Sequence, residues 1–315
     1  MVLYVINTRW RIRVKKDYVS ALMKLKAENE NLISKRIFRF FHPFKKVFSM
    51  TTILVPIDFS EASANALSFA AELAKRTSAR LFVVNVLGKG EDENEAKTKL
   101  AAIESDLRNS FGADLRFEST FAHGDLVATL KKVIAVQQPD LVVMGTKGAS
   151  GLKRILIGSN TVKVLSNTTK PVLVIPEVAR FEHFFNAGKN RIVLATDLDL
   201  LENEASLDIL KEIGLLIADP KLRLLSVRPK NSGLSDLQRL NRDFMLSLFN
   251  PEIQSERVTV FSSNVMSGIN FYLNENSDTG LLAMVARDTG NIIQRHFTRE
   301  MASHTHLPLL VLHDA

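Results

Sequence analysis

Short apolar runs alternate with amphipathic segments along most of the chain after residue 50. The runs at 81–84 (LFVV) and 141–144 (LVVM) are continuously apolar, which indicates strands covered on both faces, as in a parallel sheet. Strands are predicted near 52–57, 80–87, 115–121, 140–145 and 171–175. Helices are predicted after Ser60, a residue suited to cap a helix, over 92–110 and over 124–137. Strands and helices that alternate at these lengths predict a doubly wound α/β domain.

The same order of landmarks occurs twice. The first set is 52–58 (TILVPID), 139–144 (PDLVVM) and 170–175 (KPVLVI), and its echoes are 191–197 (RIVLATD), 278–284 (DTGLLAM) and 307–312 (LPLLVL). Asp58 precedes Met144 by 86 positions, and Asp197 precedes Met284 by 87. The chain is therefore predicted to hold two tandem domains, 50–177 and 189–315, each with a five-stranded parallel sheet, packed as a pseudo-dimer.

One glycine-rich loop carries the candidate chemistry. The segment 145–161 (GTKGASGLKRILIGSNT) follows a buried strand and leads into a helix, and it is neither a Walker A loop nor a G-x-G-x-x-G turn. Its glycines permit positive φ and let backbone N–H groups approach a phosphate, while the helix that follows attracts anions at its N-terminus. Ligands of doubly wound folds bind beyond the carboxyl ends of strands. Asp58, Val86 and Gly145 fall at such ends.

The spacing Gly145-x2-Gly148-x9-Gly158-Ser159 resembles the nucleotide motif of the ATP-binding branch of the universal stress protein family. The segments 55–60 (VPIDFS) and 170–176 (KPVLVIP) also look like that family's first and last strands, so the resemblance covers 50–176 well and 190–313 more loosely. It implies a fold like that of the adenine nucleotide alpha hydrolases. It also implies that ATP, ADP or AMP is bound, with Mg²⁺ as a further candidate.

The resemblance assigns a place to each candidate residue. Asp58 would lie on the ribose or adenine side, and the backbone of Val86 would lie near the base. The phosphates would contact Gly148, Gly158, Ser159 and Thr161. A purely structural interpretation stays open, in which the glycines only shape a turn and Ser159 only caps a helix.

The second repeat is predicted to have lost this site. Val285 stands where the first repeat has Gly145, Asp288 where it has Gly148, and Arg295 where it has Gly158. A β-branched residue does not readily take positive φ, and a carboxylate repels a phosphate. Asp197 persists, which we interpret as a turn residue. His296, His304 and His306 are a weak metal-site pattern, and ordinary turn histidines are the favoured interpretation.

The net charge of +7 is unevenly distributed. Residues 1–49 hold twelve Lys and Arg against three acidic residues, a balance of +9, which leaves −2 for the rest of the chain. A nucleic-acid surface is therefore not expected on the body of the protein. For the basic leader two interpretations stay open: a segment that lies on an anionic membrane, or residues upstream of the true start at Met50.

The absence of cysteine excludes disulfides and thiolate catalysis and fits a cytoplasmic location.

No arrangement of residues typical of strong catalysis is recognisable. We therefore expect a nucleotide-responsive regulator of the stress response, not an enzyme or at most a weak ATPase. A slow ATP hydrolase or phosphotransferase and a nucleotide-free interaction scaffold are the alternatives. A homodimer and unidentified protein partners are also compatible with a tandem chain.

Overall fold

The computed structural model describes residues 50–146, 159–181, 188–201, 204–287 and 307–314. The basic leader lies outside them, as do Gly148, Gly158 and the three histidines at 296, 304 and 306. Among the described residues, every helix is too short or too polar to span a bilayer.

The first half contains strands and helices in alternation, as predicted. Its strands are β1 (Thr52–Ile57), β2 (Arg80–Leu87), β3 (Phe117–His123), β4 (Leu141–Thr146) and β5 (Val172–Pro176). Its helices are α3 (Glu61–Thr77), α4 (Glu93–Phe111), α5 (Leu126–Gln137) and α6 (Ser159–Leu165). The predicted strand positions agree with these to within two residues.

The second half repeats the pattern. Its strands are β6 (Arg191–Ala195), β7 (Lys221–Arg228), β8 (Gln254–Phe261), β9 (Thr279–Arg287) and β10 (Leu309–Asp314). Its described helices are α8 (Ala205–Leu215), α9 (Asp236–Phe249) and α10 (Val265–Glu275).

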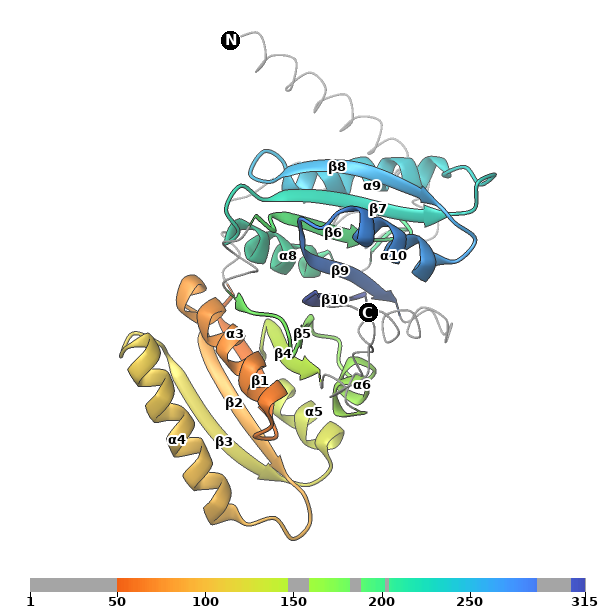
Figure 1. Ribbon diagram of the computed structural model, residues 1–315. Coiled ribbons are helices and arrows are strands. Elements are labelled where there is room, and N and C mark those ends of the chain that lie inside the picture. Colours follow the sequence, from red (N-terminus) through yellow and green to blue (C-terminus); the bar gives the residue numbers. More distant parts are fainter. Residues whose placement is uncertain (1–49, 147–158, 182–187, 202–203, 288–306, 315) are drawn as a thin grey trace.

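All ten strands form one sheet in the order β3-β2-β1-β4-β5-β10-β9-β6-β7-β8. Neighbouring strands are parallel within each half, and the halves meet where β5 and β10 pair antiparallel, with Leu310 opposite Leu173. Figure 1 shows this junction between the two halves. The predicted α/β class with two five-stranded parallel repeats is confirmed. The two sheets are joined edge to edge into one, which the sequence did not predict.

Layers of helices on both faces explain the apolar strands. All six residues of β1 are buried, and they point alternately to two cores. One core joins the sheet to α3, α4, α8 and α9, and the other joins it to α5, α6 and α10. A strand buried on both faces needs apolar side chains at every position, which is the pattern read in the sequence.

The turn between β1 and α3 shapes the end of the first strand. Phe59 takes a positive φ of 59°, and Ser60 caps α3 by accepting a hydrogen bond of 3.3 Å from the backbone N–H of Ser63. Glu61 in the first turn and Lys75 and Arg76 in the last turn complement the helix dipole. The cap predicted at Ser60 is confirmed.

Candidate functional site

A cavity of about 200 Å³ lies at the carboxyl ends of β1 and β4. In the first half the chain runs from β1 to β2 and β3 on one side, whereas β4 and β5 lie on the other side. This reversal of strand order is where open α/β sheets bind their ligands. The polar lining includes Asp58, Ser60, Gly145, Asn160 and Thr161. Three predicted site residues are thus brought together: Asp58, Gly145 and Thr161.

Asp58 follows the last residue of β1 and is exposed. Its Oδ1 accepts hydrogen bonds from the backbone N–H of Ser60 at 3.1 Å and from the Ser60 hydroxyl at 2.5 Å. A carboxylate that accepts bonds from the residue two positions ahead stabilises the turn itself. Asp58 therefore already has a structural role at the mouth of the cavity.

Gly145 contacts the start of α3. A Cβ at this position would lie 2.2 Å from the carbonyl oxygen of Ala62 and 2.6 Å from its carbonyl carbon. The φ of Gly145 is outside the left-handed region, so the expected need for positive φ is wrong at this residue. The glycine is required because β4 and α3 approach each other too closely for any side chain.

Thr161 connects α6 to β4. Its side chain is buried, and its hydroxyl donates a hydrogen bond of 2.9 Å to the carbonyl oxygen of Gly145. Ser159 is the first residue of α6. The neighbouring Thr146 is fully buried, and its hydroxyl has no hydrogen-bond partner among the described residues. An unpaired buried hydroxyl beside the loop is a group that a ligand or a water molecule can satisfy.

Val86 lies near the cavity but does not line it. Ile57 pairs with Asn85 in the parallel register of β1 and β2, so Val86 stands level with Asp58 on the neighbouring strand. Asn85 itself was not predicted. Its side chain is buried and donates a hydrogen bond of 3.0 Å to the carbonyl oxygen of Ile57, while its Oδ1 has no partner among the described residues. A single Asn inside the apolar run 81–87 was the signal that could have revealed it.

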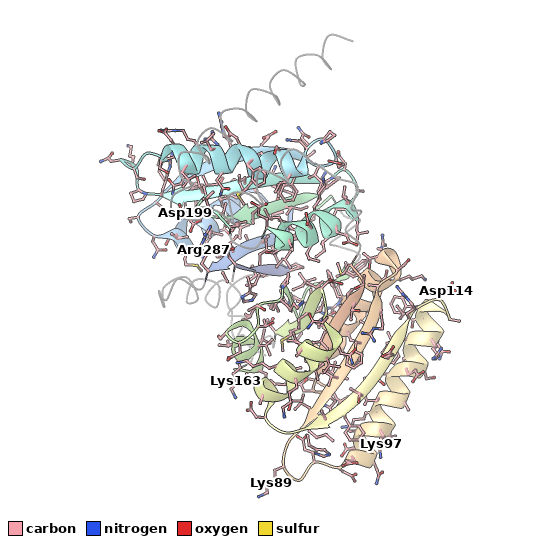
Figure 2. The ribbon with its side chains drawn as sticks, turned by 180° about the vertical axis from the view of Figure 1, so that it is seen from behind. Lys89, Lys97, Asp114, Lys163, Asp199 and Arg287 are labelled. Atoms are coloured by element: carbon pink, nitrogen blue, oxygen red, sulfur yellow. The ribbon has the colours of Figure 1, made fainter. Side chains whose placement is uncertain are left out.

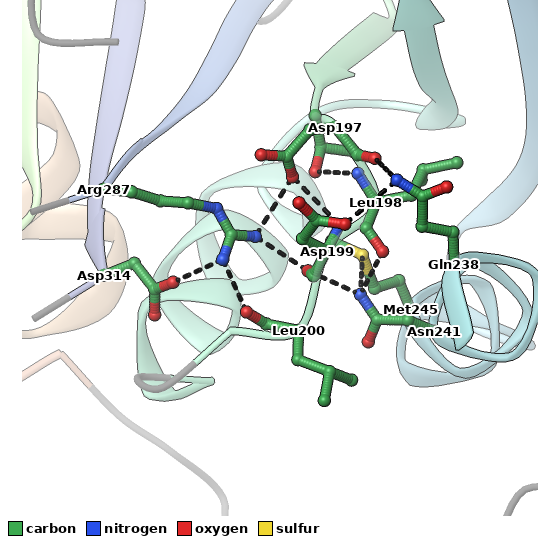
Figure 3. A network of polar contacts seen from close by, with 10 residues as sticks. Asp197, Leu198, Asp199, Leu200, Gln238, Asn241, Met245, Arg287 and Asp314 are labelled. Atoms are coloured by element: carbon green, nitrogen blue, oxygen red, sulfur yellow. Dashed lines mark hydrogen bonds and ion pairs between the residues drawn. The ribbon is translucent and has the colours of Figure 1, made fainter. Parts of the chain in front are cut away.

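In the second half, an arginine lies at the carboxyl ends of the strands, the edge that corresponds to the one with the cavity in the first half. Arg287 ends β9, and its guanidinium lies 3.1 Å from the carboxylate of Asp197 and 3.1 Å from that of Asp314 (Figure 3). It also donates to the carbonyl oxygens of Asp199 at 2.7 Å and Leu200 at 2.5 Å. Figure 2 shows Arg287 and Asp199 close together in this half. Asp197 is therefore an ion-pair partner as well as a turn residue.

This network is largely enclosed by the protein. The Arg287 side chain is only 10% exposed and that of Asp314 only 3% exposed. In the pairing of β9 with β10, Val285 lies opposite Leu312. In the pairing of β4 with β5, Gly145 lies opposite Ile175, the residue that corresponds to Leu312 in the repeat. This confirms the predicted equivalence of Val285 and Gly145. Asp288 and Arg295 lie outside the described residues.

Two described groups have a clearly shifted pKa, and neither lines the cavity. Burial raises the pKa of Glu212, whose two carboxylate oxygens both accept the backbone N–H of Met50 at 2.9 Å. Burial also raises the pKa of the Tyr272 phenol. Within the described part of the chain, no three His, Asp or Glu side chains are grouped as they would be around a metal ion.

Comparison with known proteins gives a consistent result. The model of a family described as the universal stress protein family matches residues 50–176. The universal stress protein YxiE of Bacillus subtilis is 29% identical over 39% of this chain and 97% of its own length. The universal stress protein MJ0531 of Methanocaldococcus jannaschii is 27% identical over 39% of this chain and 80% of its own.

Two solved structures resemble most of the chain. A universal stress protein from Archaeoglobus fulgidus superposes with a TM-score of 0.66 at 20% identity, covering 85% of this chain and 100% of its own. A putative universal stress protein from Pseudomonas aeruginosa gives a TM-score of 0.57 at 16% identity, covering 84% and 93%. At these identities the likeness shows that the two-repeat fold is shared.

Proposed function

We propose that this chain, whose residues 50–176 belong to the universal stress protein family, binds an adenine nucleotide in the cavity between β1 and β4. The observation that carries the proposal is the position of that cavity. It lies at the point where the strand order reverses, and the loop with the spacing Gly145-x2-Gly148-x9-Gly158-Ser159 starts from its wall. The described part of the cavity, at about 200 Å³, is smaller than the roughly 300–1,000 Å³ of a typical ligand site.

The residues present fit a nucleotide in a specific way. Asp58 at the mouth would accept hydrogen bonds from the ribose or the adenine, and the backbone of Val86, level with it, would lie near the base. Gly148, Gly158 and Ser159 would hold the phosphates with backbone N–H groups and a hydroxyl. Thr161 would act chiefly by fixing α6 against β4. When Mg²⁺ is present it would reach the site with the phosphates.

We further propose that the nucleotide acts as a signal. A ligand that binds one conformation better than another stabilises it and so biases the partners that the protein can engage. In this proposal 50–177 is the nucleotide-binding domain and 189–315 is a domain that stabilises it through the β5–β10 junction. The internal pairing of Arg287 supports the view that the second domain binds no nucleotide.

A nucleotide-free scaffold is the second candidate. It is favoured by the fact that Asp58, Gly145 and Thr161 each have a structural role that needs no ligand. These roles explain the residues of the described cavity but not the three further glycines of the loop, Gly148, Gly151 and Gly158.

Equilibrium dialysis of the full chain with labelled ATP and AMP separates these candidates. Asp58→Ala is expected to weaken binding at least tenfold, whereas Glu61→Ala, an exposed carboxylate on the next turn, is expected to leave it within twofold. Equal binding by both variants would exclude the role given to Asp58. Release of phosphate in the same samples, lost in Asp58→Ala, would identify a slow hydrolase.

A further inference from the structure

A second and larger cavity opens between α3 and α4, which lie on the same face of the sheet, α3 against β1 and β4 and α4 against β3. Its volume is about 470 Å³, which is within the roughly 300–1,000 Å³ of small-molecule sites. Figure 1 shows these two helices side by side in the first half. All its lining residues belong to the described part of the chain.

The floor and walls of this α3–α4 pocket are apolar. Leu67 and Leu107 are buried at its base, and Phe59, Ile103 and Phe111 are half-buried around it. Ala64 on α3 and Ala102 on α4 line it with small side chains that leave its entrance open. Large apolar side chains that border an open space release water when an apolar molecule enters, and this gain drives binding.

The charged groups at the pocket are placed at its rim. The ammonium of Lys99 lies 2.7 Å from the carboxylate of Glu95 and 5.1 Å from the centre of the Phe59 ring, so its charge is already balanced. The exposed carboxylate of Asp106 lies two helical turns further along α4 and also lines the pocket. The ammonium of Lys75 lies 5.8 Å from the centre of the Phe111 ring, so each of these two lysines is beside an aromatic ring that lines the pocket. A hydroxyl or amino group of a ligand could donate to Asp106.

The pocket adjoins the nucleotide cavity. Ile57 and Ser63 line both, and Phe59, which forms a wall of the pocket, is the residue directly after Asp58. Phe59 is held at a φ of 59°, a conformation that non-glycine residues seldom adopt. The turn from β1 to α3 thus directs Phe59 into the pocket and Asp58 to the cavity.

We propose that the α3–α4 pocket binds a small and largely apolar molecule that carries one hydroxyl or amino group. The apolar body lies against Leu67, Leu107 and Phe111, and the polar group lies toward Asp106. This site is separate from the proposed nucleotide site, and its existence does not depend on nucleotide binding.

Fluorescence titration with N-phenyl-1-naphthylamine, an uncharged aromatic amine, tests the proposal on the full chain. The parent protein is expected to give saturable enhancement. Ala102→Trp and Ala64→Trp, each of which places an indole in the pocket from an exposed position, are expected to weaken binding at least tenfold. Ala101→Trp is the matched control, since Ala101 is an exposed neighbour on α4 that does not line the pocket, and its affinity is expected to stay within twofold.

Three results would overturn the proposal. The first is the absence of saturable binding by the parent. The second is equal binding by the Ala102→Trp and Ala101→Trp variants. The third is that the parent sediments as a dimer that Ala102→Trp dissociates while the probe does not bind, because the pocket would then be an interface between two copies of the chain.

Discussion

The backbone of Gly145 lies so close to Ala62 that a Cβ on the glycine would be 2.2 Å from the carbonyl oxygen of Ala62. This contact brings the end of β4 against the first turn of α3, and both line the proposed nucleotide cavity. The shape of the cavity therefore depends on a position that cannot carry a side chain.

Gly145→Ala is expected to lower the free energy of unfolding by about 2–3 kcal/mol, because a backbone carbonyl cannot move aside as a flexible side chain can. Urea denaturation measures the change. Gly233→Ala is the control, since a Cβ at Gly233 would meet no atom within 4 Å, and its effect is expected to stay within about 0.5 kcal/mol. A neutral Gly145→Ala variant would contradict the close packing of β4 on α3.

Thr161→Val removes the hydroxyl that donates to the carbonyl oxygen of Gly145 and keeps the shape of the side chain. The loss of one buried hydrogen bond is expected to destabilise the protein by about 1 kcal/mol, measured by urea denaturation. Thr98→Val removes a comparable hydroxyl, which donates to the carbonyl oxygen of Asn94 on the exposed face of α4. Its smaller effect would show that burial at Thr161 makes the difference, and equal effects would show that it does not.

Arg287→Met leaves the buried carboxylate of Asp314 without its arginine, so a loss of about 3 kcal/mol is expected. Thermal and urea unfolding measure it. The double variant Arg287→Met, Asp314→Asn is expected to recover part of the loss because it removes the buried charge. Arg239→Met breaks an exposed pair with Asp236 and should change stability by less than about 0.5 kcal/mol. A double variant no more stable than Arg287→Met alone would argue against the ion pair as the cause.

The carboxyl group of Glu212 is expected to make the stability of the protein depend on pH. Burial raises its pKa above the ordinary value of 4.5, so the folded protein holds this proton more tightly than the unfolded chain does. Protonation of Glu212 therefore stabilises the folded state. This contribution is complete below the pKa of the glutamate in the unfolded chain, and it is lost as pH rises through its pKa in the folded protein. Glu212→Gln does not ionise, so its stability relative to the parent is expected to increase as pH is raised from 4 to 7. Glu275→Gln makes the same change at an exposed position of α10 and is the control variant. A flat difference for Glu212→Gln would show that burial there does not favour the protonated carboxyl.

Most of the fold could be predicted because it depends on local patterns. The apolar run of β1 and the cap at Ser60 each specify their structure within a few residues. The union of the two sheets could not be predicted. The sequences of β5 and β10 are those of ordinary buried strands, and no local pattern indicates that these two strands pair with each other. Edge pairing is decided by tertiary packing.

The sequence indicated where the candidate site lies, but not all the contacts that explain its residues. Asp58, Gly145 and Thr161 meet at one cavity, as strand-end reasoning indicates. The packing of Gly145 on Ala62 and the pairing of Arg287 with Asp314 depend on distances between segments far apart in sequence, which no spacing pattern contains. Asn85 was missed because a lone amide in an apolar run looks like an interruption of the strand.

Calorimetric titration of the full chain with ATP and AMP, beside the double variant Gly148→Asp, Gly158→Arg, tests nucleotide binding by the first repeat most directly. The variant gives this loop the residues that stand at the matching positions of the second repeat. Saturable binding by the parent that falls at least a hundredfold in the variant, with unchanged unfolding, is the predicted result. No binding by the parent, or equal binding by a folded variant, would contradict the proposal that this loop holds the nucleotide.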